Sequence, residues 1–299
     1  MDSAHLPTDL LMGAQTVIVI PVHNAVHELP RCLASLAWTS EEGATVVVVD
    51  SGSTDGTRDW IEAHAPDVLV VDGDARMWWT EAVEVGCRFA VQELGARRLG
   101  LLNVDCTWDQ LSFRAADEAM RRHSAAIVCS RVQRFEDAAT TFAGGVVRWS
   151  GMLALRGVTA SQRQPLPSAW VAWCGGQGVL LDSRVYLESG GFDYVTFPHY
   201  FGDSDFCFRA ARHGARVWYA SGSTVENDHV TSGFSPQLSG DLKRVWSTLT
   251  SRRSVFNVRD SVRFYVRHAG WRSPVALMHV YSLWAAWSAR GILRRKFHV

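Results

Sequence analysis

Between residues 16 and 130, short apolar runs rich in β-branched residues alternate with segments of helical spacing. Runs of strand length occur at 16–20, 46–49, 68–71, 99–103 and 125–129. Helices are expected over 26–37, 57–64, 79–94 and 108–122. This alternation predicts an α/β fold with a parallel, doubly wound sheet. The VVVV run at 46–49 is typical of a strand covered on both faces. Ligands of such sheets bind beyond the carboxyl ends of the strands.

The remainder of the chain extends this core. Residues 140–182 indicate further strands around glycine turns, followed by a helix near 203–213 and a strand at 216–220. The last sixty residues indicate two or three basic, aromatic helices. At 299 residues, the chain is long enough for one large domain over 1–239 and an appended helical subdomain over 240–299.

Charge is divided unevenly along the chain. Residues 240–299 carry twelve Lys and Arg against two Asp, whereas the first 239 residues carry 18 basic and 28 acidic side chains. A basic tail on an acidic body indicates a tail that meets an anionic surface. We expect that surface to be a membrane rather than nucleic acid.

The segment at 274–292 supports that expectation. It is apolar, contains Trp284 and Trp287, and precedes the basic run 294–296. Aromatic and basic residues in this arrangement fit an interfacial helix on an anionic membrane. The alternative is a dimerisation or lid subdomain in which both tryptophans belong to a core.

The cysteines, the first residues and the apolar stretches of the sequence favour a cytoplasmic protein with peripheral attachment to the inner face of the plasma membrane. The six cysteines are scattered among apolar residues and form no C-x-x-C pair, so we expect reduced core thiols. The first residues lack the layout of a signal peptide. No stretch reaches the roughly 18–20 apolar residues that a spanning helix needs.

Polar residues follow two of the predicted strands. Asp50 ends the run at 46–49, where its carboxylate can accept a hydrogen bond from a nucleobase or ribose; an Asx turn is the alternative. Asn103 and Asp105 follow a later strand and point the same way on an extended backbone. One carboxylate beside an amide suits a divalent cation on a diphosphate, and a helix cap is the alternative. The chain has neither a P-loop nor a dinucleotide-binding glycine motif.

A second group of candidates lies towards the C-terminal half. Asp203 and Asp205 stand at the start of a predicted helix, where one could act as a general base and where simple capping is the alternative. The WCGGQG segment at 173–178 combines an aromatic ring with glycines that let a ligand approach the backbone. His229 follows a strand and a polar turn, which alone indicates little.

In this order, the motifs resemble those of family 2 glycosyltransferases over about residues 16–235. The segments that carry the resemblance are IPVHN at 20–24, VVVVDSGSTDGT at 46–57, GDARMWWTEAVEVG at 73–86, LLNVD at 101–105, WCGGQGVLLDSRVYLESGGFD at 173–193 and FGDSDFCFRAARHG at 201–214, with His229. The WWT element resembles a bacterial branch of rhamnosyl- and galactofuranosyl-type transferases. The resemblance implies a GT-A fold, a Rossmann-like mixed sheet flanked by helices, that binds a nucleoside diphosphate sugar.

The resemblance also implies roles for individual residues. Asp50 would accept the N3–H of uracil or thymine, and Asp105 would hold Mn²⁺ or Mg²⁺ with His229. Asp203 would deprotonate the acceptor hydroxyl for inverting attack, while Asp205 would orient the acceptor or the donor sugar. The implied donor-binding residues are Pro21, His23, Asn24, Asp50, Arg76, Trp78, Trp79, Asn103 and Asp105. The implied acceptor-binding residues are Trp173, Gly175, Gly176 and Asp205.

Five positions depart from the family pattern. Asn103 stands where the first Asp of D-x-D is usual, Ser51 where a second Asp is common, and Gly202 where an acid precedes the base. Glu81 and Glu84 replace Gly and Asn beside the WWT element. Extra negative charge near a diphosphate costs binding unless a cation offsets it. The two glutamates therefore either face away from the donor or indicate an unusual one.

Together these features predict a metal-dependent, inverting transferase that moves a sugar from a UDP- or dTDP-sugar to a glycan or lipid-linked glycan in bacterial surface polysaccharide synthesis. Its nucleotide-binding half would be about 16–130 and its acceptor half about 131–239. The alternatives are a polyprenyl-phosphate sugar synthase and a catalytically lapsed nucleotide-sugar-binding scaffold. A nucleotidyltransferase would need a basic loop after the first strand, which the chain lacks.

Overall fold

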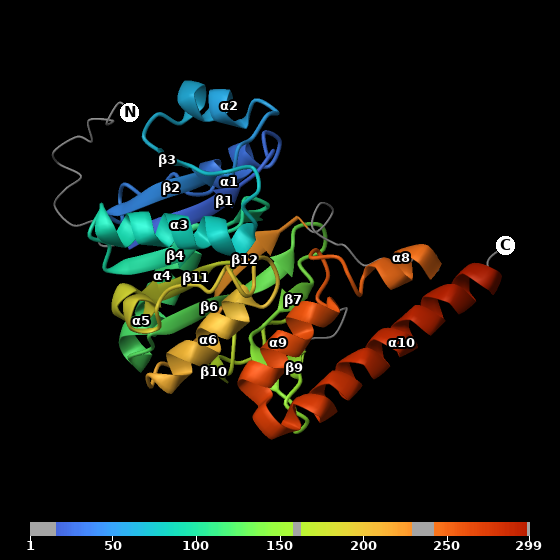
Figure 1. Ribbon diagram of the computed structural model, residues 1–299. Helices are drawn as coiled ribbons and strands as arrows, with labels where there is room; N and C mark the ends of the chain where they lie inside the picture. The colour runs from blue at the N-terminus through green and yellow to red at the C-terminus, as the bar shows by residue number, and fades with distance from the viewer. Residues whose placement is uncertain (1–15, 158–162, 229–241, 298–299) are drawn as a thin grey trace.

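The computed structural model describes residues 16–157, 163–228 and 242–297. They form a central sheet covered by helices on both faces, with further helices packed at one side (Figure 1). The strands are β1 (Thr16–Val22), β2 (Ala44–Asp50), β3 (Leu69–Asp72), β4 (Arg98–Leu101), β5 (Cys106–Thr107), β6 (Ile127–Arg134), β7 (Thr140–Phe142), β8 (Gly145–Val147), β9 (Leu153–Leu155), β10 (Ala169–Val171), β11 (Val179–Asp182) and β12 (Val217–Asn227). The helices are α1 (Leu29–Ala34), α2 (Thr57–His64), α3 (Trp79–Gln92), α4 (Gln110–His123), α5 (Ser183–Glu188), α6 (Gly202–Arg212), α8 (Leu242–Ser247), α9 (Val258–Ala269), the 3-10 turn η3 (Gly270–Arg272) and α10 (Ser273–Phe297).

Each strand and helix predicted between residues 16 and 130 is present, with ends shifted by a few residues. The sheet order is β10-β12-β6-β11-β4-β1-β2-β3. The strands predicted between residues 16 and 130 run parallel to one another, whereas β11, from a later part of the chain, enters antiparallel between β4 and β6. The mixed sheet that the family resemblance implied is confirmed. Because β11 runs in reverse, the glycine-rich segment before it lies at the carboxyl ends of its neighbours.

The strands of the sheet centre are buried on both faces, as the VVVV run predicted. Val17 and Val19 of β1 join a core with α3, α5 and α6, while Ile18 and Ile20 join one with α1, α2 and α4. All four side chains are fully buried. Burial of each such side chain contributes roughly 1.5–3 kcal/mol, which makes the sheet a firm base for the loops at its edge.

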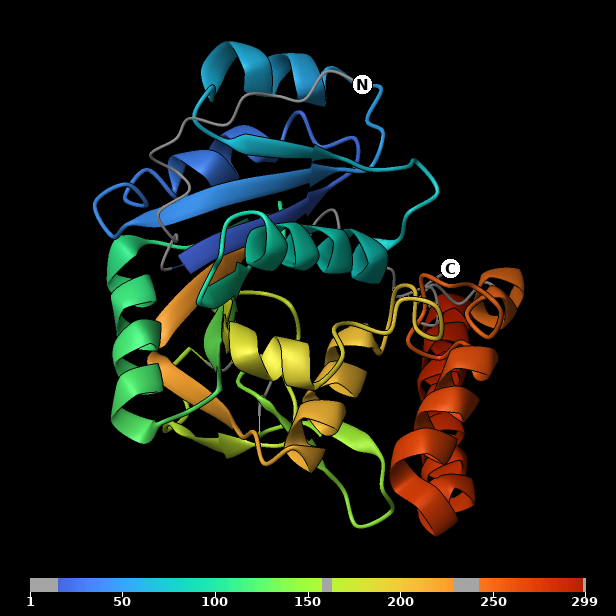
Figure 2. The ribbon, with the colours of Figure 1, turned by 60° about the vertical axis from the view of Figure 1, so that its left-hand side comes forward.

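The basic, aromatic helices predicted for the last sixty residues are α8, α9 and α10. Figure 2 shows them gathered on the side of the molecule away from α4. A third core joins them to the body: Phe201, before α6, stacks on Phe264 of α9 with ring centroids 4.8 Å apart. Among the described residues, no helix is long and apolar enough to cross a membrane.

The cysteines behave as the sequence predicted. All six are buried, and none forms a disulfide. Burial raises the pKa of Cys87 and Cys106 and brings that of Cys32 to about 12, while hydrogen bonds with neighbouring thiols, followed by burial, raise the pKa of Cys174 and Cys207. They are therefore unreactive core residues.

Candidate active site

Four chain segments meet at the edge of the sheet where the parallel strands end. Val22 ends β1 and Asp50 ends β2, and these two residues are register partners. Leu101 ends β4 and accepts a hydrogen bond from the N–H of Gly178, just before β11. The amino end of α6 reaches the same place, because Asp203 lies 3.4 Å from the position of a Cβ on Gly175. Most of the predicted site residues thus belong to one edge.

The nucleoside end of the site is built by the loops after β1 and β2. His23 and Asn24 are exposed, whereas Asp50 is only 6% exposed. The His23 Nδ1 hydrogen-bonds the Ser51 carbonyl at 2.8 Å, and the Asn24 amide oxygen accepts from the Thr54 N–H at 2.7 Å. Asn24 adopts a positive φ of 50°, which this pairing supports. The loops are thereby fixed relative to each other.

Asp50 forms part of a turn at the end of β2. Its Oδ1 accepts the N–H of Ser53 at 3.0 Å, which is the Asx-type turn that the sequence offered as an alternative. The two readings are compatible, because a carboxylate has several lone-pair sites. Pro21, in β1, is half-buried beside it.

Arg76 takes a different position from the one expected for a donor contact. Its side chain is 89% exposed and folds back on Asp74, with an Nη2–Oδ2 distance of 2.7 Å. The Asp74 carboxylate therefore already balances its charge, and the hydrogen bonds from Arg76 hold the pKa of Asp74 well below its usual range. The same loop packs on Gly52 through Ala75, and Gly52 has a φ of 66° that only glycine adopts readily.

Trp79 occupies the centre of the site. Its indole Nε1 donates to the Asn103 amide oxygen at 2.8 Å. The ring lies so close to Gly176 that a Cβ there would overlap it. Asn103 therefore positions Trp79 through this hydrogen bond. Trp78, half-buried, forms the N-cap of α3.

Asp105 fits the minimal requirement for a divalent cation on a diphosphate. Its side chain is 8% exposed, and its carbonyl accepts the N–H of Asp228 at 3.0 Å. The end of β12 thus reaches Asp105, although His229 lies outside the described residues. One carboxylate with the Asn103 amide supplies the oxygen donors that Mg²⁺ or Mn²⁺ accepts. Within the described ranges, no group of three or more His, Cys, Asp or Glu could hold a metal.

Asp203 has the environment of a general base. It is half-buried, and its Oδ1 accepts the Ser204 N–H at 2.6 Å. A small space lined by apolar side chains such as Leu101 and Phe206 lies behind it, together with Gly175 and Gly176. Burial raises the pKa of Asp203 to about 6, against the effect of the Ser204 hydrogen bonds. A carboxylate with such a pKa is a stronger base than an exposed one and is still ionised at neutral pH.

Asp205 does not face the acceptor side, and the expectation that it orients acceptor or donor is not supported by its position. The side chain is fully buried. It accepts hydrogen bonds from Arg209 at 2.7 Å, Arg267 at 3.0 Å and His268 at 2.7 Å. Burial alone would raise the pKa of Asp205, but these donors bring it below its usual value. Asp205 instead joins α6 to α9.

Trp173 is likewise engaged in packing. Its indole lies against Gly145, where a Cβ would overlap the ring, and against Phe142 at 5.6 Å between centroids. The ring surface expected to stack on an acceptor sugar is thus partly covered. Gly175 and Gly176, by contrast, lie between Trp79 and Asp203, as an acceptor or donor contact requires.

Two of the unusual positions have local explanations. Glu84 faces away from the donor loops: its carboxylate accepts the Tyr186 hydroxyl at 2.9 Å and the Phe192 N–H at 2.7 Å. Its charge therefore does not bear directly on a diphosphate. Gly202 packs against Thr80, so that a Cβ there would overlap the threonine side chain.

Sequence reasoning missed a cluster next to Trp78: His199, Tyr200, Arg252 and Arg253. The His199 ring contacts Trp78 edge-on at 5.4 Å and Tyr200 at 4.9 Å. Arg252, from the turn before α9, lies over the Trp78 ring at 5.8 Å. The FPHYFGDSD run contains the histidine and tyrosine just before the base, which is the signal that could have identified them.

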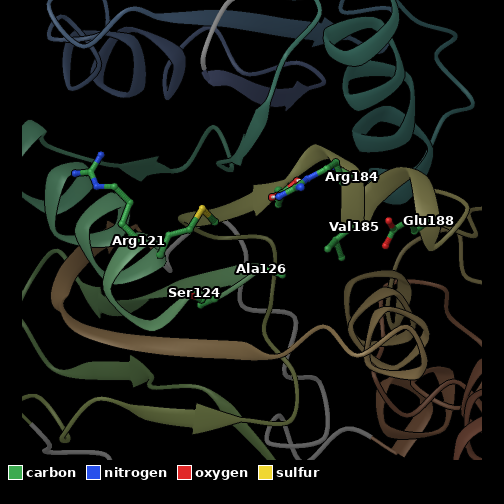
Figure 3. Close-up of a pocket in the computed structure, with 9 residues that line it drawn as sticks. Arg121, Ser124, Ala126, Arg184, Val185 and Glu188 are labelled. Carbon is green, nitrogen blue, oxygen red and sulfur yellow. Dashed lines mark hydrogen bonds and ion pairs between the residues drawn. The ribbon is translucent and has the colours of Figure 1, made fainter.

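A cavity of about 480 Å³ lies elsewhere, between α4, β11 and α5 (Figure 3). Its lining includes Arg121, Asp182, Arg184 and Glu188. Asp182 ends the antiparallel β11 opposite Arg98, which begins β4. The cavity therefore opens at the amino edge of the sheet, away from the candidate active site.

Comparison with known proteins agrees with this architecture. Residues 17–162 match the family model "Glycosyl transferase family 2". A pre-mycofactocin glycosyltransferase of Mycobacterium tuberculosis is 25% identical over 72% of this chain, which spans 43% of that relative's length. An undecaprenyl-phosphate mannosyltransferase of Micrococcus luteus is 25% identical over 76% of this chain and 90% of the relative. The mannosyltransferase PcManGT from Pyrobaculum calidifontis, solved with GDP-Man and Mn²⁺, has a TM-score of 0.54 at 15% identity and covers 97% of this chain and 87% of its own.

The mixed sheet with helices on both faces is the GT-A fold of nucleotide-sugar transferases. Residues 17–162 thus form a glycosyl transferase family 2 region, and the curated relatives that match the chain are glycosyltransferases. Membership of the rhamnosyl- and galactofuranosyl-type branch stays a prediction.

Proposed function

We propose that the protein is an inverting glycosyltransferase that moves a sugar from a nucleoside diphosphate donor, UDP- or dTDP-linked, to a hydroxyl of a glycan or lipid-linked glycan. The observation that carries the proposal is the position of Asp203. Its carboxylate stands across Gly175 and Gly176 from Trp79 and Asn103, at the same sheet edge as Asp50. A base on one side of a gap and a nucleotide pocket on the other suit in-line displacement at an anomeric carbon.

Each part of the reaction then has a residue. His23, Asn24 and Asp50 hold the nucleoside, and the packed loops behind them keep that pocket in shape. Trp79, fixed by Asn103, limits the position of the donor sugar. Asp203 accepts the proton of the acceptor hydroxyl as its oxygen attacks the sugar, a contribution of roughly 10²–10⁴ in rate.

Asp105, with Asn103 and His229, would hold a Mn²⁺ or Mg²⁺ ion. Such an ion supplies neutralisation of the diphosphate charge as the leaving group departs. The Mn²⁺ in the Pyrobaculum mannosyltransferase complex supports this assignment by likeness of fold.

Calorimetric titration with UDP and dTDP, with and without Mn²⁺, tests the donor site. We expect one nucleotide to bind in a metal-dependent manner to the wild type and the Asp105→Ala variant to lose that binding. GDP serves as a comparison, since the Pyrobaculum relative was solved with GDP-Man. If no nucleoside diphosphate binds under any condition, the donor-site assignment is wrong.

A second experiment separates an enzyme from a binding scaffold. The Asp203→Asn variant should bind nucleotide like the wild type but lose the slow hydrolysis of the sugar nucleotide. A wild type that binds nucleotide but neither hydrolyses nor transfers the sugar would favour the scaffold.

A polyprenyl-phosphate sugar synthase is the second candidate. The likeness to the Micrococcus undecaprenyl-phosphate mannosyltransferase, over 90% of that relative, favours it. Product analysis with polyprenyl phosphate and with neutral glycan acceptors distinguishes the two candidates.

As part of the same proposal, the C-terminal helices rest on the anionic inner face of the membrane. On α9, Val258, Val262 and Val266 are exposed at four-residue spacing, and Trp271 of η3 is 84% exposed. We call these four residues the α9 apolar row. The exposed Arg259 and Arg272 accompany it, and each basic residue near an anionic membrane contributes about 1 kcal/mol. Such a position would bring the site close to a lipid-linked acceptor.

A further inference from the structure

The turn between α8 and α9 brings two arginines to the edge of the candidate active site. Arg252 and Arg253 are both exposed. The Arg252 guanidinium lies 5.8 Å from the centre of the Trp78 ring, and the charge of Arg253 acts on the His199 ring. Among the described residues, neither arginine has a carboxylate within ion-pair distance, unlike Arg209 and Arg267.

Next to these arginines, His199 has a buried ring nitrogen, Nδ1, without a hydrogen-bond partner in the described part of the chain. Burial, and then the charge of Arg253, lowers the pKa of His199 to about 4, so the ring is neutral at physiological pH. An unsatisfied buried polar atom costs about 1–3 kcal/mol, and such atoms are typical of positions that a ligand or water completes.

Contacts between residues show which side of the site these groups occupy. Asn103 holds Trp79, Trp79 packs on Gly176, and Gly175 lies beside Asp203. On the other side, Tyr200 lies near Asp203, since burial and the Asp203 charge raise the pKa of Tyr200. The Tyr200 ring contacts His199, and the His199 ring contacts Trp78. The arginines therefore lie at Trp78 and His199, and His199 is joined through Tyr200 to the surroundings of Asp203.

We infer that Arg252, Arg253 and His199 form a subsite for an anionic group of the acceptor, a phosphate in the first instance, next to the hydroxyl that Asp203 deprotonates. The inference rests on the proposed function and deepens it by naming the acceptor class. Two guanidinium groups that form no ion pair among the described residues supply up to ten N–H donors, and guanidinium geometry matches phosphate oxygens. The cation–π contact with Trp78 holds one of them at the site.

The subsite also gives the C-terminal segment a role in the site. The arginines come from the C-terminal segment, whereas the nucleotide pocket comes from the first 130 residues. The C-terminal helices thus complete the acceptor site as well as covering the third core. Acceptor recognition and the position of α9 are coupled through Asp205, which binds Arg267 and His268 of that helix.

Inorganic phosphate is the probe for the test. It is titrated into the full-length protein, first alone and then with the nucleoside diphosphate and Mn²⁺ at saturation, while the His199 ring resonances are followed by NMR and assigned with the His199→Gln variant. We expect phosphate to shift these resonances in both states. In the Arg252→Gln/Arg253→Gln variant, the dissociation constant for phosphate should rise at least tenfold, while nucleotide affinity stays within twofold of the wild type.

The matched control is Arg259→Gln/Arg290→Gln, which removes two exposed arginines of the same C-terminal part and the same total charge. This control should bind phosphate like the wild type. Equal weakening in both double variants would show a general charge effect and overturn the subsite. Loss of the phosphate response on nucleotide saturation, or loss of nucleotide affinity in Arg252→Gln/Arg253→Gln, would assign the arginines to the donor diphosphate instead. Failure of the proposed function is distinguishable, because it shows as absence of nucleotide binding by the wild type.

Discussion

Asp203 and Asp205 lie two residues apart on α6, but their surroundings differ. Asp203 faces a largely apolar space and has few donors, so burial dominates its pKa. Asp205 is more deeply buried, yet three basic side chains surround it. The first turn of α6 thus presents one carboxylate suited to proton transfer and another suited to holding two helices together.

The raised pKa of Asp203 predicts the pH dependence of catalysis. The base must be ionised to accept a proton, and its pKa is about 6. We therefore expect kcat/KM for sugar transfer or donor hydrolysis to be level above pH 7 and to fall about tenfold per pH unit below about 6. A pH–rate profile checks this. An acid limb near 4, the ordinary range of a carboxyl group, would show that Asp203 is not the base.

Substitution by asparagine should affect stability in opposite directions at the two positions. For Asp203 the folded-state pKa is raised, so ionisation costs stability above about pH 6 and the cost disappears as the pH falls towards 4. The shift from 3.8 to about 6 corresponds to about 3 kcal/mol. Asp203→Asn should therefore stabilise the protein at pH 7.5 by up to that amount.

Asp205→Asn should instead destabilise by about 3–5 kcal/mol at pH 7.5, because three buried donors lose their anion. The folded-state pKa of Asp205 is lowered, so its contribution is present at neutral pH and is lost as the pH falls through that lowered value. Urea unfolding at pH 7.5 and 4.5 measures both variants. Equal effects of the two substitutions would contradict the distinction between them.

The residue scale also shows what a sequence can and cannot reveal about a site. Asp50, Asp105 and Asp203 were identifiable because each follows a strand or begins a helix within a recognisable motif. The role of Asp205 was not, because its partners Arg267 and His268 lie 62 and 63 residues further along the chain. Local patterns carry no information about which distant helix will cover a given carboxylate.

At the scale of elements, apolar runs predicted the strands because central strands are buried on both faces, as Val46 and Val47 are. The direction of β11 was not predictable from its own residues, since VLLD is equally compatible with either direction. Its direction is decided by the glycine turn before it, where Gly178 has a φ of 66° and bonds Leu101. That turn is also what brings the glycines to the site.

The close contact between Gly176 and Trp79 predicts the effect of adding one methyl group. Gly176→Ala would overlap the indole, so Trp79 must move and the Nε1 hydrogen bond to Asn103 should break. We expect a stability loss of about 1–3 kcal/mol, typical of overpacking, and at least tenfold lower kcat/KM. Urea unfolding and donor hydrolysis measure the two effects.

Gly222→Ala is the control for that substitution. A Cβ there meets only Ala115 at 3.7 Å, an ordinary contact, and the backbone does not require glycine. This variant should behave like the wild type. Unchanged activity in Gly176→Ala would mean that the position of Trp79 does not govern donor binding.

For the molecule as a whole, the division of charge along the sequence coincides with the division between the C-terminal helices and the body. The basic C-terminal part packs on the acidic body through a shared aromatic core, and it leaves the α9 apolar row exposed. The sequence showed the charge division and the apolar segment 274–292 but placed the apolar contact surface there. In the structure, Ala276 and Val280 of that segment are buried in the core, whereas Met278 and Trp287 are exposed, and α9 adds the exposed valines of the α9 apolar row.

This arrangement predicts salt-dependent binding to anionic membranes. The full-length protein should sediment with vesicles of phosphatidylglycerol and phosphatidylcholine but not with vesicles of phosphatidylcholine alone, and raising the salt concentration should release it. Val266→Glu places a charge in the middle of the α9 apolar row, where the wild-type side chain is 59% exposed, and should weaken binding at least fivefold. Leu111→Glu, at a 76% exposed position on α4, is the control and should bind like the wild type. Because both sites are exposed, neither change should affect folding. Equal binding by all three proteins would exclude the row as the membrane contact, and the row would then be a surface for a protein partner or a second copy of the chain.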